Sequence, residues 1–230
     1  MEKLIFLLGD AEKGVIPKAR TRLREALLAT GPSLERAGVS KADFTVADLD
    51  DPIADGVAQF NAHGLLDAKV SLWLDSVDLV EEVYGVLAPR AARIAGYLVT
   101  ESIPRALEGH EPVPGGQSPG VQLVTTFPRP ERLDPETFYA RWHGSHTPLS
   151  LEIHPLLQYN RNSVARSLTS AAPRLDAIVH ESVASAQIAA DPISFYRSEE
   201  DQKRAYEDLL SFVDFADLSM VLMNEYALIV

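Results

Sequence analysis

The predicted strands and helices follow the same order on either side of a proline- and glycine-rich stretch near the middle of the chain. Residues 104–120 hold four prolines and four glycines and lack helical and strand periodicity, so they are predicted to form a linker. The segments before and after it, 1–103 and 121–230, each read as strand, helix, strand, strand, helix and strand. That order is typical of the ferredoxin-like unit, in which four antiparallel strands carry two helices on one face.

The individual elements are predicted from the spacing of apolar residues and from capping signals. In the first half, we expect strands at 3–8, 44–49, 68–74 and 94–103 and helices at 17–29 and 78–88. In the second half, we expect strands at 121–127, 156–168, 175–188 and 218–230 and helices at 134–149 and 198–212. The second half therefore repeats the first one.

One face of each predicted sheet has no helix to cover it. Leaving that face in water costs about 25 cal/mol per Å² of apolar area, so two such units normally pack sheet against sheet. We therefore predict an α+β fold in which two tandem ferredoxin-like (βαββαβ) repeats form one barrel within the chain, with an enclosed and largely apolar interior. The alternative is two independent small domains on a flexible linker.

Composition argues against several classes of function. A net charge of -12 repels nucleic acid and anionic lipid headgroups, and the absence of cysteine removes disulfides, thiolate nucleophiles and cysteine-bound metals. The apolar run at residues 4–8 is too short for a signal peptide, and no stretch approaches the roughly 18 to 20 apolar residues of a membrane helix. We expect a soluble, cytoplasmic protein with no nucleic acid or membrane partner.

The segment from Phe138 to Leu149 holds the residues best suited to chemistry. At about 100° per residue, Phe138, Trp142 and His146 share one face of the predicted helix, and that face points inward. His146 would then reach the barrel mouth, where an imidazole of ordinary pKa near 6.5 can act as base or acid. The competing interpretation is a histidine bonded to a backbone carbonyl at a helix end. His143 lies at the edge of the stripe and is expected to meet solvent.

Three further histidines differ in their expected surroundings. His154 stands in a turn close in sequence to the predicted pocket. His180 lies in an alternating strand and points either into or out of the barrel. If it points inward, it is a second polar group that faces His146, and Glu181 then faces outward. His63 lies in a predicted loop and is expected to be exposed.

The same segment resembles the signature of EthD-domain proteins. The resemblance covers about residues 121–230 and rests on Phe138, Trp142, His146, Pro148, Leu149, Tyr159, Asn162 and the stretch 214–217. It implies a member of the dimeric α+β-barrel superfamily, here similar to a fused dimer. Related barrels of that superfamily include polyketide cyclases, muconolactone isomerases, cofactor-free monooxygenases and heme-binding tandem barrels.

The resemblance also implies site residues. It makes His146 the pocket histidine, with Trp142, Tyr159 and Asn162 as its neighbours. Because Tyr159 and Asn162 are three residues apart in a strand, they lie on opposite faces unless a bulge intervenes, and only one reaches the cavity. The helix at 17–29 has neither Trp nor His, so the first half is interpreted as a degenerate copy without a pocket of its own.

We therefore expect an enzyme that needs no cofactor and no metal and that binds a small carbonyl or phenolic ligand. Cyclisation, dehydration or isomerisation would follow from proton transfer by His146. The predicted substrate-binding residues are Trp142, Tyr159, Asn162, His180 and His154. The alternative is a non-enzymatic protein that binds a small ligand, or a heme held through a histidine. A third interpretation is a purely structural duplicated barrel with a filled interior. Pairing of fused barrels into a homodimer is left open.

Overall fold

The computed structural model describes residues 1–9, 17–49 and 59–230. The first half contains β1 (Glu2–Gly9), α1 (Pro17–Leu28), α2 (Gly31–Arg36), β2 (Val39–Val46), β3 (Phe60–Asn61), β4 (Ala68–Leu74), α3 (Val80–Leu87) and β5 (Arg93–Arg105). The second half contains β6 (Val121–Phe127), α4 (Pro135–Tyr139), a π-helical segment (Ala140–His146), α5 (Thr147–Ile153), β7 (Gln158–Ser167), β8 (Ala177–Val183), α6 (Ala186–Ala190), α7 (Pro192–Tyr196), α8 (Glu199–Leu210) and β9 (Ser219–Ile229). Short 3₁₀ turns lie at Val77–Leu79, Ala88–Arg90 and Phe215–Asp217.

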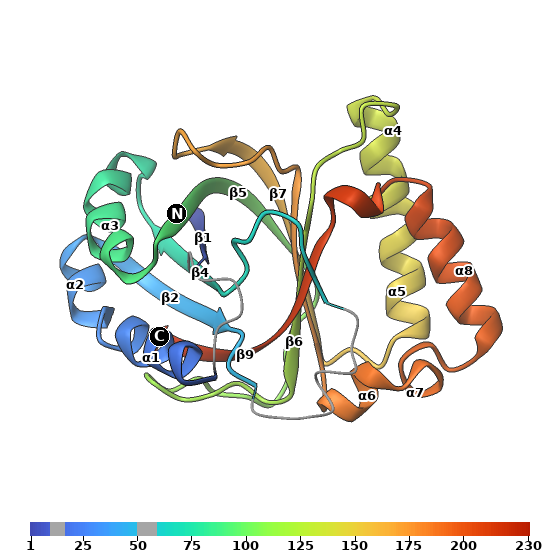
Figure 1. The fold of residues 1–230 in the computed structure, drawn as a ribbon, viewed down its shortest axis with the longest axis horizontal. Coiled ribbons are helices and arrows are strands. Elements are labelled where there is room, and N and C mark those ends of the chain that lie inside the picture. The colour runs from blue at the N-terminus through green and yellow to red at the C-terminus, as the bar shows by residue number, and fades with distance from the viewer. Residues whose placement is uncertain (10–16, 50–58) are drawn as a thin grey trace.

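Eight strands close into one antiparallel barrel. Their order is β2-β4-β1-β5-β7-β8-β6-β9, and β9 pairs again with β2, while the two-residue β3 adds to β9 outside the ring. Figure 1 shows the barrel in the middle, with α1 to α3 on one side and α4 to α8 on the other. The pairs β5–β7 and β2–β9 join the two halves, so the alternative of two independent domains is wrong.

Each half of the chain supplies four neighbouring strands of the barrel. Without β3, these strands lie in the order second, third, first and fourth of their own half. Helices cover the outer face of each four-stranded group (Figure 1), and the inner faces of the two groups face one another. The α+β barrel predicted from the repeated element order is confirmed at this level.

Side chains alternate between the inside and the outside of the barrel. In β1, Leu4, Phe6 and Leu8 join the apolar core beneath α1 to α3, whereas Ile5 and Leu7 join the core inside the barrel. A third core lies beneath the helices of the second half. A strand that is covered on both faces needs apolar side chains on both faces, which explains the continuous apolar run of β1.

Two predicted elements of the second half end differently in the structure. The helix expected at 134–149 is interrupted by the π-helical segment and continues to Ile153. Asp134 caps its start as predicted, because its side chain accepts a bond from the amide of Thr137. The strand expected at 175–188 ends at Val183, since Ser185 caps α6 instead.

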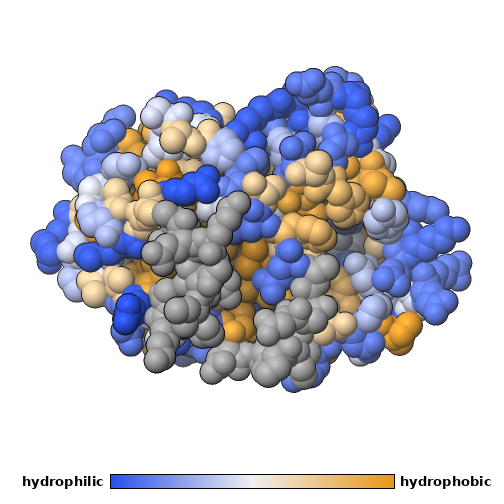
Figure 2. Space-filling view, viewed as in Figure 1, coloured by the Kyte–Doolittle hydropathy of each residue, from blue (hydrophilic) through white to orange (hydrophobic). Residues whose placement is uncertain are grey.

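The outer surface of the helices is polar. Figure 2 shows mainly hydrophilic residues over the helices of the second half, as amphipathic helices on a sheet require. Within the part of the chain that the structure describes, no helix combines the length and apolarity that a membrane crossing needs.

Candidate active site

A cavity of about 410 Å³ lies between the helices of the second half and the outer face of the sheet. Its floor comes from β6, β7, β8 and β9, and its roof comes from the segment around α5 and from α7 and α8. Exposed residues of α8 such as Lys203 and Tyr206 also line it, so the cavity reaches the surface. Seven aromatic side chains take part in the lining: Phe127, Trp142, Tyr159, Phe195, Tyr196, Tyr206 and Phe215.

The cavity lies outside the barrel, although the sequence predicted a pocket in the barrel interior. Helices that cover a sheet turn their apolar stripe toward the outer face of that sheet. A side chain on this stripe therefore meets the sheet before it can reach the interior. The inward-facing stripe of Trp142 and His146 is real, and the space it faces is the one between helix and sheet.

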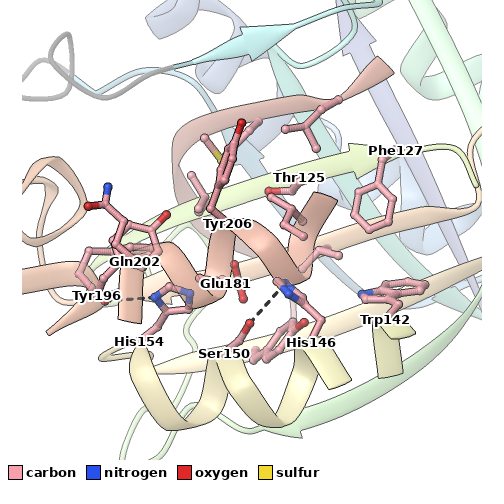
Figure 3. A pocket seen from close by; sticks show the side chains of 18 of the residues that line it. Thr125, Phe127, Trp142, His146, Ser150, His154, Glu181, Tyr196, Gln202 and Tyr206 are labelled. Carbon is pink, nitrogen blue, oxygen red and sulfur yellow. Dashed lines mark hydrogen bonds between the residues drawn. The ribbon is translucent and has the colours of Figure 1, made fainter. Parts of the chain in front are cut away.

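The π-helical segment sets the position of His146. Pro148 has no amide hydrogen, so the regular i→i−4 ladder cannot continue through it. The amide and the hydroxyl of Thr147 both bond to the carbonyl of Trp142 five residues earlier. His146, Ser150 and His154 follow one another at intervals of four residues and therefore share one face. After the wider turn, this face points toward the cavity (Figure 3).

Both ring nitrogens of His146 have a partner. Nδ1 lies 2.8 Å from Oδ2 of Asp208 on α8, and Nε2 lies 3.3 Å from the hydroxyl of Ser150. Burial acts to raise the pKa of Asp208, but hydrogen bonds from His146 and Ser145 outweigh it, and the pKa is lowered. The Asp208 carboxylate therefore stays ionised and fixes Nδ1 as the donor, so that Nε2 is the nitrogen on the Ser150 side, in the cavity.

Glu181 on β8 is an acidic side chain in this aromatic cavity. Figure 3 shows its carboxyl group between His154 and His146. Burial raises its pKa to about 7, and the nearby His146 opposes this only in part. No hydrogen bond or ion pair to the carboxyl group is found within the described residues. The group is therefore poised between acid and base at neutral pH.

Two more polar side chains of the lining stay uncharged. Burial lowers the pKa of His154 to about 4, and its Nδ1 lies 3.1 Å from the backbone carbonyl of Phe195. Burial also raises the pKa of Tyr159, whose hydroxyl lies 3.4 Å from that of Thr147. Both side chains can therefore offer hydrogen bonds without adding charge to the cavity.

The structure brings four of the six sequence-predicted site residues together. His146, Trp142, His154 and Tyr159 all line the cavity. Asn162 and His180 do not: both point into the barrel, where the Asn162 amide bonds to the carbonyl of Ile178. Tyr159 and Asn162 thus lie on opposite faces of β7, as their spacing predicts.

The expected pairing of His180 with His146 does not occur, because the sheet separates them. His180 bonds to Gln122 at 2.7 Å and to Lys69 at 3.1 Å inside the barrel. Its neighbour Glu181 alternates to the other face and enters the cavity. His143 also differs from its expected exposure, since it is half-buried beside Trp142 and burial lowers its pKa to about 4.

Sequence reasoning missed two residues of the site, Glu181 and Asp208. A signal for Glu181 was present, since it is the only acid in the strand Ala177–Val183, which must be covered on both faces. Asp208 carries no such signal, because it is one of several acids on the helix Glu199–Leu210. Among the described residues, no group of three or more His, Asp or Glu side chains is placed to hold a metal ion.

No protein-family model and no curated protein matches the sequence. Solved structures are similar over almost the whole chain. An anthrone oxidase-like protein has a TM-score of 0.61 at 14% identity, with 98% of this chain and 92% of that chain covered. A chlorite dismutase variant from Candidatus Nitrospira defluvii has a TM-score of 0.50 at 11% identity, with 99% and 92% covered.

A third similar structure is a dye-decolorizing peroxidase from Bacteroides thetaiotaomicron, with a TM-score of 0.50 at 9% identity and coverage of 98% and 93%. At these identities the similarity concerns the fold alone. The shared architecture is an α+β barrel, and this chain builds the whole barrel by itself.

Proposed function

We propose that this chain is a cofactor-independent enzyme that binds a flat aromatic carbonyl or phenolic compound and removes a proton from a carbon next to the carbonyl group. The observation that carries the proposal is Glu181, a carboxyl group with a pKa raised to about 7 among aromatic side chains. A solvated carboxylate is a weak base near neutrality, whereas a desolvated one matches the ideal pKa for general catalysis.

In such a reaction, one residue of the cavity removes the proton and others donate hydrogen bonds to the oxygen that becomes negative. The Glu181 carboxylate takes the proton, so the C–H bond breaks and its electron pair forms a carbon–carbon double bond. The carbonyl oxygen becomes an enolate oxygen. In its imidazolium form, which the Asp208 carboxylate stabilises through Nδ1–H, His146 also carries a proton on Nε2 and donates a hydrogen bond from it to the enolate oxygen. The Tyr159 hydroxyl, which its raised pKa keeps protonated, is a second donor.

The same enolate is the common start of cyclisation, dehydration and isomerisation, so the site suits each of these three reaction types. We further propose that the two halves are tandem ferredoxin-like repeats and that the second half is of the EthD type. Support comes from the strand order that both halves share and from the residues of the EthD-like segment that line the cavity. The similar anthrone oxidase-like structure supports an aromatic ketone as the substrate class.

The test is solvent-deuterium exchange into 2-tetralone and anthrone, followed by NMR without oxygen. Both probes are flat aromatic ketones with acidic methylene protons next to or in conjugation with the carbonyl group. We expect the protein to speed the exchange of at least one of them, and Glu181→Gln to slow it by roughly 100-fold or more. A Glu181→Gln variant that exchanges at the wild-type rate contradicts the proposal.

Two further variants make this result specific. His146→Ala should also slow the exchange, since the enolate oxygen then loses its donor. Glu199→Gln is the matched control, because Glu199 lines the rim of the same cavity and takes no part in the proposed proton transfer. Thermal unfolding of each variant establishes that the fold is intact.

A heme protein is the second candidate, and His146 is the observation that favours it. An imidazole whose Nδ1 is held by a carboxylate and whose Nε2 faces a cavity would be suited to hold a heme iron. The rest of the lining suits a heme less well. It offers one lysine, Lys203, for the propionates and two carboxyl groups, Glu181 and Glu199. Titration with hemin decides: a Soret band that His146→Ala abolishes would favour this candidate.

A further inference from the structure

The interior of the barrel has one apolar end and one polar end. Residues of the apolar core such as Leu7, Ala47, Ala95 and Val221 fill one end. At the other end the strands β1, β2, β6 and β7 begin and the strands β4, β5, β8 and β9 finish. Many of the inward side chains there are polar or charged: Lys3, Lys41, Asp43, Lys69, Trp73, Glu101, Gln122, Gln158, Asn160, His180 and Glu225.

A cavity of about 230 Å³ lies at this polar end. It is separate from the candidate active site, because the sheet stands between them. The segment after β5 passes over it and contributes Leu107, His110 and Ser118 to the lining. The volume is below the roughly 300–1,000 Å³ of sites for drug-sized ligands, so an occupant must be small.

The buried cations beneath the cavity already have partners. Lys3 forms an ion pair with Glu101 at 2.6 Å. Lys69 donates to the hydroxyl of Ser71 at 3.0 Å and to Nδ1 of His180 at 3.1 Å. Nδ1 of His180 is thus the acceptor, and its Nε2–H is directed to Gln122. These groups have little capacity left to bind an anion.

Several hydrogen-bond acceptors that line the cavity, in contrast, have no partner within the described residues. Oδ1 of Asp43, Oε1 of Gln158 and Oδ1 of Asn160 are buried and have no hydrogen-bond partner within the described residues. Asp43 Oδ1 lies 3.8 Å from the Lys69 ammonium, which is too far for a hydrogen bond. A buried acceptor without a partner destabilises the folded protein, so three of them together favour a ligand that donates hydrogen bonds.

Glu225 adds a fourth acceptor to the same cavity. Its side chain is buried, and its Oε1 lies 3.5 Å from Nε2 of His180. Burial, together with the negative charge of Asp43, raises its pKa to about 7. A cation placed beside Asp43 and Glu225 would relieve the repulsion between the two carboxylates.

We propose that this barrel-mouth cavity binds a small aliphatic diamine. Its ammonium groups would donate to Asp43, Glu225 and the side-chain oxygens of Gln158 and Asn160. Its methylene chain would lie against apolar lining residues such as Leu107 and Ala227. A metal ion fits less well, since no group of three His, Asp or Glu side chains in the described chain converges on one point.

The experiment is calorimetric titration with 1,4-diaminobutane, 1,4-butanediol and succinate, three probes of equal chain length and different charge. Salt of roughly 0.15 M limits the range of interactions between exposed charges to about 8 Å and so suppresses binding to the exposed acids of the surface. The diamine is expected to bind at least tenfold more tightly than the diol, and succinate is expected not to bind. Equal affinity for diamine and diol, or no binding of the diamine, overturns the proposal.

Three variants locate the diamine. Glu225→Gln and, as a second variant at the half-buried rim, Gln158→Leu should each weaken it by about tenfold or more. Glu181→Gln is the matched control in the other cavity and should leave the affinity unchanged. If Glu181→Gln weakens the diamine while the two barrel-mouth variants do not, the proposal is wrong. Unfolding of each variant without ligand identifies any loss that comes from misfolding.

Discussion

The outer faces of the two four-stranded groups have equivalent strand pairings, but one carries a filled apolar core and the other a cavity. In the first half, Leu4 of β1 pairs with Leu72 of β4, and both lie in a filled apolar core under α1 to α3. In the second half, Leu123 of β6 pairs with Glu181 of β8. Leu4 and Leu123 are each the third residue of their strand, and Leu72 and Glu181 are each the fifth of theirs. Glu181 therefore stands where the first half has Leu72.

The same arrangement of strands and helices thus holds a filled core in one half and a cavity in the other. Leucine at position 72 completes the packing between sheet and helices, and no part of it is exposed. A glutamate in the equivalent place cannot be packed so tightly, because its carboxyl group must keep some polar surroundings. The helices above it differ accordingly, since they carry His146, Ser150 and His154 instead of an aliphatic stripe.

The largest expected effect comes from placing the acid in the filled half. Leu72→Glu removes a buried leucine and adds a carboxyl group without a partner, so we expect the free energy of unfolding at pH 7 to fall by about 5 kcal/mol. Urea denaturation measures this fall. Leu72→Ala is the control, because it creates a cavity without a charge and should cost about 3 kcal/mol. If the two variants cost the same, the first half also contains a polar space, and the comparison fails.

The reverse exchange, Glu181→Leu, should separate function from stability. Proton exchange on 2-tetralone is expected to fall by roughly 100-fold or more, while the protein becomes more stable. The sign follows from the raised pKa of Glu181. The folded protein binds this proton more tightly than the unfolded chain does, so wild-type stability is lost as pH rises from the ordinary value near 4.5 through about 7.

The expected gain from Glu181→Leu therefore depends on pH. It should be small at pH 4 and reach about 3 kcal/mol at pH 8, where wild type must ionise a buried carboxyl group. Denaturation at both pH values measures it. Glu225, whose pKa is also raised to about 7, contributes the same trend to both proteins and cancels in the difference. An equal gain at both pH values would mean that Glu181 is already solvated.

The sequence predicts the barrel well because its evidence is repeated. The apolar runs of β1 and β6 and the matching order of the later elements each occur twice, so one half supports the interpretation of the other. Local chemistry predicts the start of α4, because Asp134 and Pro135 act within one turn. The end of β8 was missed, since the Ser185 cap competes with a run of apolar residues that also suits a strand.

The site is predicted less completely because contacts across the sheet are not encoded by spacing. The helical wheel identifies the shared face of Trp142 and His146, but which side of the sheet this face meets depends on the helix layer. The alternation of β8 shows that His180 and Glu181 lie on opposite faces, without showing which face is the barrel interior. Asp208 meets His146 only through the packing of α8 against the π-helical segment.

A smaller effect is expected for Asp208→Asn, which removes the carboxylate that holds Nδ1 of His146. The asparagine can no longer hold a charged imidazolium, so exchange on 2-tetralone should slow by about tenfold to 100-fold. Because Asp208 acts through His146, the pH dependence of the rate should shift as well, and ¹⁵N NMR of the ring should report a changed tautomer. Ser145→Ala is the matched control, since it removes the other hydrogen bond to Asp208 and leaves the imidazole contact in place. Unchanged kinetics and an unchanged tautomer in Asp208→Asn would show that His146 is positioned by Ser150 and the π-helical segment alone.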